Sequence, residues 1–116
     1  MTKPEVEATL LDIVLACRNL EDFAAGLSYA SWLQDDSVAA RQARSAILHE
    51  ILILGEAVKR LPRSFRNAHP EVPWTKIAGM RDRLIHRYHE VDLTIVWGVV
   101  WDEIPSLRRH LERLLP

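Results

Sequence analysis

The sequence predicts an all-α fold, an up-and-down bundle of four to five helices formed by a single domain over residues 1–116. Apolar residues recur at steps of three and four along several long segments, which is the spacing of one helix face. A chain of 116 residues with 48% hydrophobic and 27% charged residues can enclose one core. We therefore expect a folded protein with no internal domain boundary.

The first helix is expected from Pro4 to about Gly26. Its apolar stripe comprises Val6, Leu10, Ile13, Cys17, Leu20, Ala24 and Leu27. Pro4 suits a first helical turn, where its missing N–H costs nothing, and this favours it as the start over a cap at Thr2 or Thr9. Gly26 is typical of a helix end.

A short helix and a second long helix should follow. Ser28 can cap a short helix that runs through Leu33, and the Asp-Asp-Ser cluster at 35–37 can accept the free N–H groups of the next helix. That helix begins at Val38 and should stop before Pro62. Its stripe comprises Ile47, Ile51, Leu54, Val58 and Leu61.

Prolines interrupt the chain before the next helix. Ser64 can cap a brief turn, which Pro70 and Pro73 interrupt. From Trp74 to about Tyr88 the pattern again predicts a helix. Its inward positions are Ile77, Met80 (or Arg81) and Leu84.

Asp92 can cap the last helix, which Pro105 should kink. Propensity alone would allow a strand over 93–101, but the spacing of four between Trp97 and Trp101 favours a helix. This stretch is apolar nearly all round, so one face can pack on the core while another needs a cover. We expect a homodimer interface there; the alternative is a central position within the monomer.

Composition limits the compartment. Cys17 is a lone cysteine and cannot form an internal disulfide, and no secretion signal is recognisable at the start of the chain. The longest apolar run, residues 93–101, is far shorter than the roughly 20 residues that a membrane-spanning helix needs. We expect a cytoplasmic protein without a membrane span.

Charge is unevenly distributed along the chain. Residues 1–58 carry four basic and nine acidic side chains, a net charge of −5, and residues 59–87 carry eight basic and two acidic ones, a net charge of +6. The remainder has a net charge of −2, from three basic and five acidic side chains. A cationic middle third suits a phosphate-bearing ligand, although solvated surface arginines or an acidic protein partner would give the same pattern.

The segment 81–88 holds the side chains best suited to chemistry. Asp82 precedes His86 by one helical turn and could orient its imidazole. A histidine can take a proton from a ribose 2′-hydroxyl or give one to the leaving oxygen, and an arginine such as Arg81 can stabilise the charge that develops on phosphorus. This chemistry requires no metal or other cofactor.

The spacing within this segment poses a geometric problem. Five residues separate Arg81 from His86, which places them about 140° apart on an ideal helix, whereas Arg81 and Tyr88 share a face. Convergence then requires either a kink or helix end near Ile85, or a cleft shared between two subunits.

Several short motifs, spread along the chain and given in order at the end of this paragraph, together resemble the HepT-like branch of the HEPN superfamily. The resemblance spans roughly residues 5 to 115, and the pattern Arg, four residues, His, one residue, Tyr is met by Arg81, His86 and Tyr88. Asp82 stands where the family often has Asn, and His89 stands where an aromatic residue is more usual. The matching stretches are 53–57, 61–62, 73–74, 77–80, 81–88 and 91–92, followed by Trp97 and Pro105.

The resemblance implies a toxin of a toxin–antitoxin pair that dimerises and acts as a metal-independent endoribonuclease, leaving a 2′,3′-cyclic phosphate on RNA. It implies His86 as general base or acid and Arg81 as the stabilising cation. Its implied partner is a minimal nucleotidyltransferase antitoxin, which would transfer AMP to Tyr88. Bulky, anionic phosphates beside the cleft would block RNA and repel it.

Supporting roles and an alternative complete the expectations for this segment. Asp82 is a supporting residue, and Arg83, Arg87 and Lys76 are expected to hold the RNA backbone. The alternative is a non-catalytic helical partner module that the nucleotidyltransferase binds and modifies.

Other polar residues receive weaker interpretations. Asp82, His86 and His89 could face one side of a continued helix, but three ligands on one helix rarely complete a metal site, and none is predicted. Glu56 is expected to pair with an arginine of the cationic third, and the alternative is a catalytic role. The other histidines have no recognisable constellation around them in the sequence; they are His49, His69 and His110.

Overall fold

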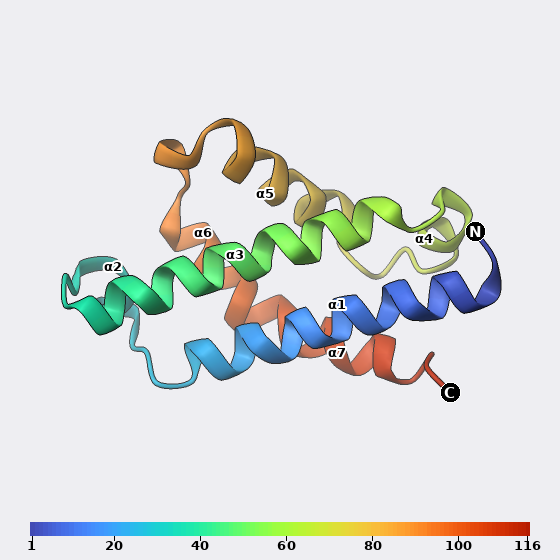
Figure 1. Cartoon of the computed structure of the whole chain (residues 1–116), viewed down its shortest axis with the longest axis horizontal. Helices are drawn as coiled ribbons and strands as arrows, with labels where there is room; N and C mark the ends of the chain where they lie inside the picture. Colours follow the sequence, from blue (N-terminus) through green and yellow to red (C-terminus); the bar gives the residue numbers. More distant parts are fainter.

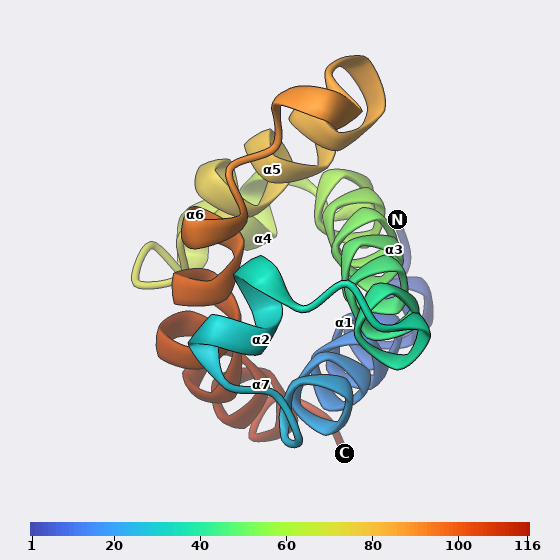
Figure 2. The same cartoon turned by 90° about the vertical axis from the view of Figure 1, so that its left-hand side faces the viewer.

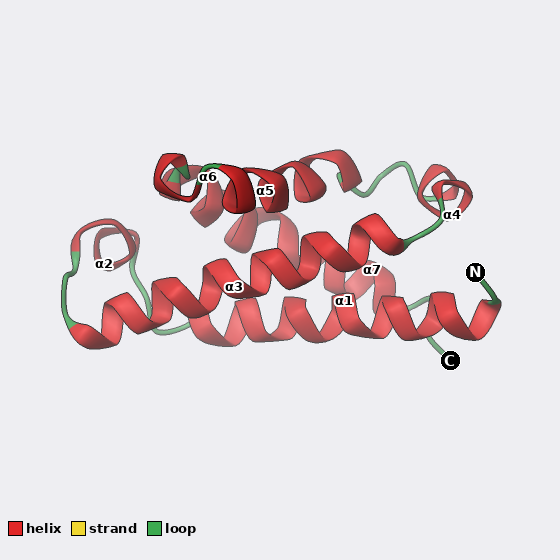
Figure 3. Cartoon of the chain, turned by 45° about the horizontal axis from the view of Figure 1, so that its top comes forward, coloured by secondary structure: helices red, strands yellow, loops and turns green.

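The computed structural model describes all 116 residues and contains helices without strands. Four long segments run up and down alternately, joined by short loops and three short helices (Figures 1 and 3). This architecture confirms the predicted all-α bundle. The long segments are α1 (Lys3–Ala24), α3 (Val38–Arg60), α5 (Trp74–His86) and the continuous run α6 (Leu93–Gly98), η2 (Val99–Glu103) and α7 (Ile104–Glu112); the short helices are α2 (Tyr29–Gln34), α4 (Arg63–Ala68) and η1 (Tyr88–Glu90).

The start of α1 corrects one expectation. Pro4 does lie in the first turn, but Thr2 is the cap: its hydroxyl accepts the N–H of Glu5, whose carboxylate accepts the N–H of Thr2. This reciprocal capping box satisfies the backbone N–H groups of Thr2 and Glu5. Pro4 has no side-chain acceptor and could not satisfy either of them. The helix therefore begins at Lys3, one residue earlier than predicted, and it ends before Gly26 as expected.

The caps of α2 and α3 are as predicted, and that of α4 is not. Ser28 accepts the N–H of Ser31, and Ser37 accepts that of Ala40. Ser64 lies inside α4 and caps nothing, because the Pro62 carbonyl already accepts the N–H of Arg66 and starts that helix earlier. Local hydrogen bonds thus fix the starts of these helices.

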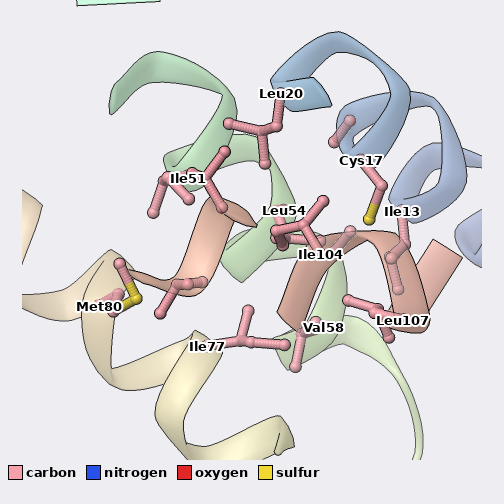
Figure 4. Close-up of a cluster of buried hydrophobic side chains, with 14 of the residues drawn as sticks. Ile13, Cys17, Leu20, Ile51, Leu54, Val58, Ile77, Met80, Ile104 and Leu107 are labelled. Carbon is pink, nitrogen blue, oxygen red and sulfur yellow. The ribbon is translucent and has the colours of Figure 1, made fainter. Parts of the chain in front are cut away.

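The core lies between the long helices. It joins 26 buried side chains into one cluster, with members on α1, α3, α5 and the last segment (Figure 4). Ile77, Met80 and Leu84 of α5 are buried as predicted, while Arg81 is only partly covered. The buried side of α5 is therefore apolar, and Arg81 lies at its edge toward α3.

The last helical segment is covered on one side only. Asp92 caps α6 as expected, and Pro105 falls in the first turn of α7 after the wider turns of η2. Val96, Val99 and Val100 are buried. Ile95 and Trp101 remain 42% and 45% exposed, so part of this apolar helix faces solvent.

Helix α2 covers another part of the same segment at the end of the bundle seen in Figure 2. The Trp32 indole donates a 2.7 Å hydrogen bond to the Leu93 carbonyl. The rings of Tyr29 and Trp32 pack against Trp97, with centroids 5.9 Å and 6.1 Å away. Trp97 thereby anchors the packing of α2 against α6. None of the helices has the length and apolar character needed to cross a bilayer.

Candidate active site

Helix α5 holds both Arg81 and His86 in regular helical turns. It ends at His86, where the Arg87 N–H donates to the Arg83 carbonyl at 2.8 Å and the Arg87 backbone leaves helical values. Because this end follows His86, it does not turn that side chain toward Arg81, and the two stay about 140° apart around the helix. One of the two routes to convergence considered above is therefore closed within a single chain.

Arg81 is held between α3 and α5 by two carboxylates. Its Nη1 donates to Asp82 Oδ1 at 3.0 Å, and its Nη2 lies 3.5 Å from Glu56 Oε1. The expected pairing of Glu56 with an arginine is thus confirmed. The Arg81 Nε is buried without a hydrogen-bond partner, although 22% of the side chain is exposed. The guanidinium is therefore oriented, and its bonding capacity is only partly used.

Gly55 makes room for Arg81. A Cβ added to Gly55 would lie 2.8 Å from the Arg81 Cγ and closer still to its Cβ. No ordinary contact is that short, so any larger residue at position 55 would push α3 and α5 apart. Glycine here sets the distance between the two helices at the point where the arginine enters.

Asp82 has two cationic partners. Its Oδ1 accepts a hydrogen bond from Lys59 Nζ at 2.8 Å, as well as the one from Arg81. These two hydrogen bonds, that from Lys59 foremost, hold the pKa of Asp82 below its ordinary value. No hydrogen bond joins Asp82 to His86, so in the single chain Asp82 orients Arg81 and does not orient the imidazole.

A polar groove runs along the end of α5 and the segment that follows. His86 is exposed in it between two arginines, and Arg87 pairs with Glu90 at 3.6 Å. Arg81 is not among the residues that line this groove. The lining residues are Asp82, Arg83, His86, Arg87, Glu90 and Asp92.

Tyr88 lies just beyond the helix, in η1, and is 53% exposed. Its ring meets His89 edge to face, with centroids 5.9 Å apart, and its hydroxyl has no hydrogen-bond partner in the chain. It lines a neighbouring groove together with Arg41 and Arg44 of α3. The hydroxyl is thus accessible, beside two cations that the sequence alone did not connect with it.

Lys76 lies far from this groove. It is in the first turn of α5, ten residues before His86, which corresponds to about 15 Å along the helix axis. Its Nζ pairs with Glu103 Oε1 of η2 at 2.6 Å. The structure therefore gathers Asp82, Arg83 and Arg87 around His86 but leaves Lys76 apart.

The metal site that was considered and not predicted does not form. Helix α5 ends at His86, so His89 does not continue the helix face of Asp82 and His86. A different group of possible ligands does come together elsewhere, namely His69, Glu71 and His110. His69 and His110 are 41 residues apart in the sequence, so the sequence did not indicate that these side chains would meet.

Comparison with known proteins places the chain in a family. The model of the family described as "Ribonuclease HepT-like" matches residues 13–114. A protein named "Probable ribonuclease HepT" from Thermococcus cleftensis is 37% identical over 105 residues, which cover 90% of this chain and 91% of the relative. A candidate RNase from Caldanaerobacter subterraneus is 39% identical over 103 residues, covering 89% of this chain and 88% of the relative.

A candidate RNase from Methanocaldococcus jannaschii is 32% identical over 115 residues, covering 99% of this chain and 91% of the relative. No solved structure gives a significant match. The family match extends over nearly all of the helical bundle, including the whole of α3 and α5 with the groove at the end of α5. The chain therefore belongs to the HepT-like ribonuclease family.

Proposed function

We propose that this protein is a metal-independent endoribonuclease and the toxin of a toxin–antitoxin pair. The observation that carries the proposal is the groove at the end of α5, which an exposed His86 lines together with Arg83 and Arg87. An imidazole can exchange protons near neutral pH, and the flanking guanidinium groups can hold the phosphates on either side of a scissile bond. The family assignment agrees with an RNA substrate.

A second copy of the chain completes the site in this proposal. Arg81 and His86 lie on different faces of α5, so one chain does not present both to the same phosphate. Apolar side chains that a partner would cover lie close by: Ile85 is 45% exposed next to His86, and Ile95, 42% exposed, lines a small pocket with Arg83. A two-fold interface over this region would bring Arg81 of one chain near His86 of the other.

The reaction follows from these roles. His86 removes the proton of the ribose 2′-hydroxyl, and the resulting oxygen attacks the adjacent phosphorus. Arg81 stabilises the additional negative charge in the transition state. The bond from phosphorus to the 5′-oxygen then breaks, and that oxygen takes a proton from the now protonated His86 or from water. The products are a 2′,3′-cyclic phosphate and a 5′-hydroxyl.

Control of the toxin is proposed to act at Tyr88. Its hydroxyl makes no hydrogen bond within the chain, and the exposed Arg41 lies in the same groove, where it could receive the phosphate of a nucleotide. Arg44 also lines this groove, but its guanidinium already donates to the carbonyls of Ser31, Trp32 and Asp35. A nucleotidyltransferase antitoxin that attaches AMP there adds negative charge two residues from His86. That charge would repel the RNA backbone from the groove.

The direct test is cleavage of RNA by purified protein in the presence of a metal chelator. The parent should cut and leave a 2′,3′-cyclic phosphate, and His86→Ala should cut at least about 100-fold more slowly, the lower end of what general acid–base catalysis contributes. His49→Ala is the matched control, because His49 is an exposed histidine outside both grooves. Equal rates for His86→Ala and the parent would remove the catalytic assignment.

The exposure of Tyr88 also suits the second candidate function, a partner module without nuclease activity. In that case the protein should form a complex with the nucleotidyltransferase and gain the mass of AMP on Tyr88, yet leave RNA uncut at high protein concentration. Modification without cleavage by the parent would therefore select this function over the ribonuclease.

A further inference from the structure

Three side chains with metal-binding atoms converge where the loop between α4 and α5 meets α7. His69 ends α4, Glu71 lies in the loop, and His110 is on α7. The His110 Nε2 is 2.9 Å from Glu71 Oε1 and 3.3 Å from His69 Nδ1, and the third side of the triangle, from His69 Nδ1 to Glu71 Oε1, is 3.7 Å. Two imidazole nitrogens and one carboxylate oxygen thus lie within 3.7 Å of one another.

These distances are those of one face of a zinc tetrahedron. With bonds of about 2.0 to 2.1 Å, two ligand atoms of a tetrahedral Zn²⁺ ion lie about 3.3 Å apart. The three observed sides, 2.9, 3.3 and 3.7 Å, have this value as their mean. Two histidines and a glutamate are also a ligand set that Zn²⁺ uses in proteins, with water in the fourth position.

His69 is held in place without any ion. Its carbonyl accepts hydrogen bonds from the Trp74 indole at 2.9 Å and from the Val72 N–H at 3.2 Å. Its ring packs against Phe65, with centroids 4.6 Å apart. The ligand is therefore preorganised by α4 and by the first residue of α5, which lowers the entropy that binding must overcome.

Without a metal, the three facing atoms, His69 Nδ1, His110 Nε2 and Glu71 Oε1, share too few N–H protons for each of the acceptors among them to receive a hydrogen bond of its own. If both imidazoles are neutral, a single N–H on His110 Nε2 can point at Glu71 Oε1 and His69 Nδ1 together. A cation at the centre uses all three lone pairs instead, and His110 then carries its proton on Nδ1 and His69 on Nε2. The change needs no net loss of protons.

The fourth ligand position of such an ion would be open to solvent, and the groove beside it contains both a carboxylate and a guanidinium group. Glu71 is 53% exposed, and an open groove beside it is lined by Glu103 and Arg113 as well as by His110. Glu103 has one oxygen paired with Lys76 and the other buried without a partner. A divalent cation would meet a second carboxylate nearby, and Arg113 is the one positive charge in that groove.

We propose that His69, Glu71 and His110 bind a Zn²⁺ ion, with water as the fourth ligand, and that this ion fastens the loop between α4 and α5 to α7. The site lies at the start of α5, and the groove with His86 lies at its end, about 20 Å away along a helix of 13 residues. The ion is structural and takes no part in RNA cleavage, so the proposal stands whether or not the protein is a nuclease.

The test measures Zn²⁺ binding to the metal-free, untagged protein by calorimetry, with Co²⁺ as a spectroscopic probe. One ion should bind per chain, and Co²⁺ should give the intense visible bands of a tetrahedral site. His110→Ala and Glu71→Gln should each weaken zinc binding by more than about 100-fold, since even changes outside the ligand shell cost about 10- to 100-fold. Circular dichroism of both variants shows whether the bundle remains folded.

Stability provides a second readout, and His49→Ala serves as the control. At a free zinc concentration of about one hundred times the Kd, Tm should rise by about 10 °C in the parent and in His49→Ala, but not in His110→Ala. Parent-like binding by His110→Ala together with loss of binding in a His86→Ala/His89→Ala double variant would place the ion at the groove and overturn the proposal. Absence of binding at millimolar Zn²⁺ would overturn it as well.

Discussion

The two ends of α5 use similar residue types in opposite ways. At its end, His86, Arg83 and Arg87 are exposed in an open groove. At its start, His69 and His110 are largely covered and directed at the same carboxylate. Exposed, incompletely paired groups are available to a substrate or a second subunit, whereas converging ones already resemble a ligand shell. One helix thus separates the groove proposed to cleave RNA from the site proposed to bind a cation.

The largest effect that would test this contrast concerns Arg81. Arg81→Ala should lower the rate of RNA cleavage about 100- to 1,000-fold, the loss typical of removing one donor that stabilises transition-state charge. Arg81→Lys should retain only part of the cleavage rate, because a single ammonium group cannot contact Glu56 and Asp82 through two separate nitrogens as the guanidinium does. Cleavage assays give the rates, and zinc binding should be unchanged in both variants.

A mixed experiment sharpens the subunit argument. Arg81→Ala and His86→Ala chains, each inactive alone, should regain part of the activity when mixed, because a heterodimer can form one intact cleft from the Arg81 of one chain and the His86 of the other. Activity is measured over a range of mixing ratios. Failure of the mixture to exceed the separate variants, although the chains exchange, would argue that each chain supplies both residues to its own site.

The contact between α3 and α5 can be broken at Gly55. Gly55→Ala should lower the free energy of unfolding by about 1 to 3 kcal/mol, because the new methyl group overlaps Arg81 and forces the helices apart. Gly79→Ala is the matched control: a Cβ there meets nothing within 4 Å, so helix propensity should stabilise it by up to about 1 kcal/mol. Urea unfolding measures the free energy of unfolding of both variants. Equal free energies would show that α3 and α5 can move apart without loss of stability.

The two ends should also differ in how they bind RNA. Arg83→Gln should weaken binding and reduce the slope of log Kd against log salt concentration by about 0.7, the value for one phosphate contact with a single strand. Lys76→Gln should leave that slope unchanged, because Lys76 is paired with Glu103 at the opposite end. Binding is best measured in the His86→Ala background, where RNA stays intact; equal slopes for the two substitutions would remove the distinction between the ends.

The smallest expected effect is the pH dependence contributed by Asp82. Lys59 and Arg81 hold the pKa of Asp82 below its ordinary value, so its contribution to stability is present above the unfolded-state pKa of about 4 and is lost as pH falls through the lower folded-state pKa. In Asp82→Asn, the urea midpoint should therefore fall less steeply below about pH 4 than in the parent. If the urea midpoint of Asp82→Asn falls below pH 4 as steeply as that of the parent, the hydrogen bonds of Asp82 do not stabilise the fold.

The residues of the groove illustrate what could be read in advance. The pattern of Arg81, His86 and Tyr88 directed attention to the end of α5. The chain belongs to the HepT-like family, and the roles of these three residues stay a prediction. The partners of Arg81 were only partly predicted: Glu56 was expected to pair with an arginine, but the hydrogen bond from Arg81 to Asp82 was not expected. Lys76 was grouped with the arginines because it is near them in sequence, yet the helix carries it to the other end.

By itself, the sequence determined the helices, because their apolar stripes and their caps at Ser28, Ser37 and Asp92 depend on groups no more than four residues apart. Only the tertiary structure decided that Gly55 would lie against Arg81 and that His69 would meet His110, 41 residues away. Such contacts depend on how the helices pack against one another, and residue spacing within one helix carries no information about that arrangement.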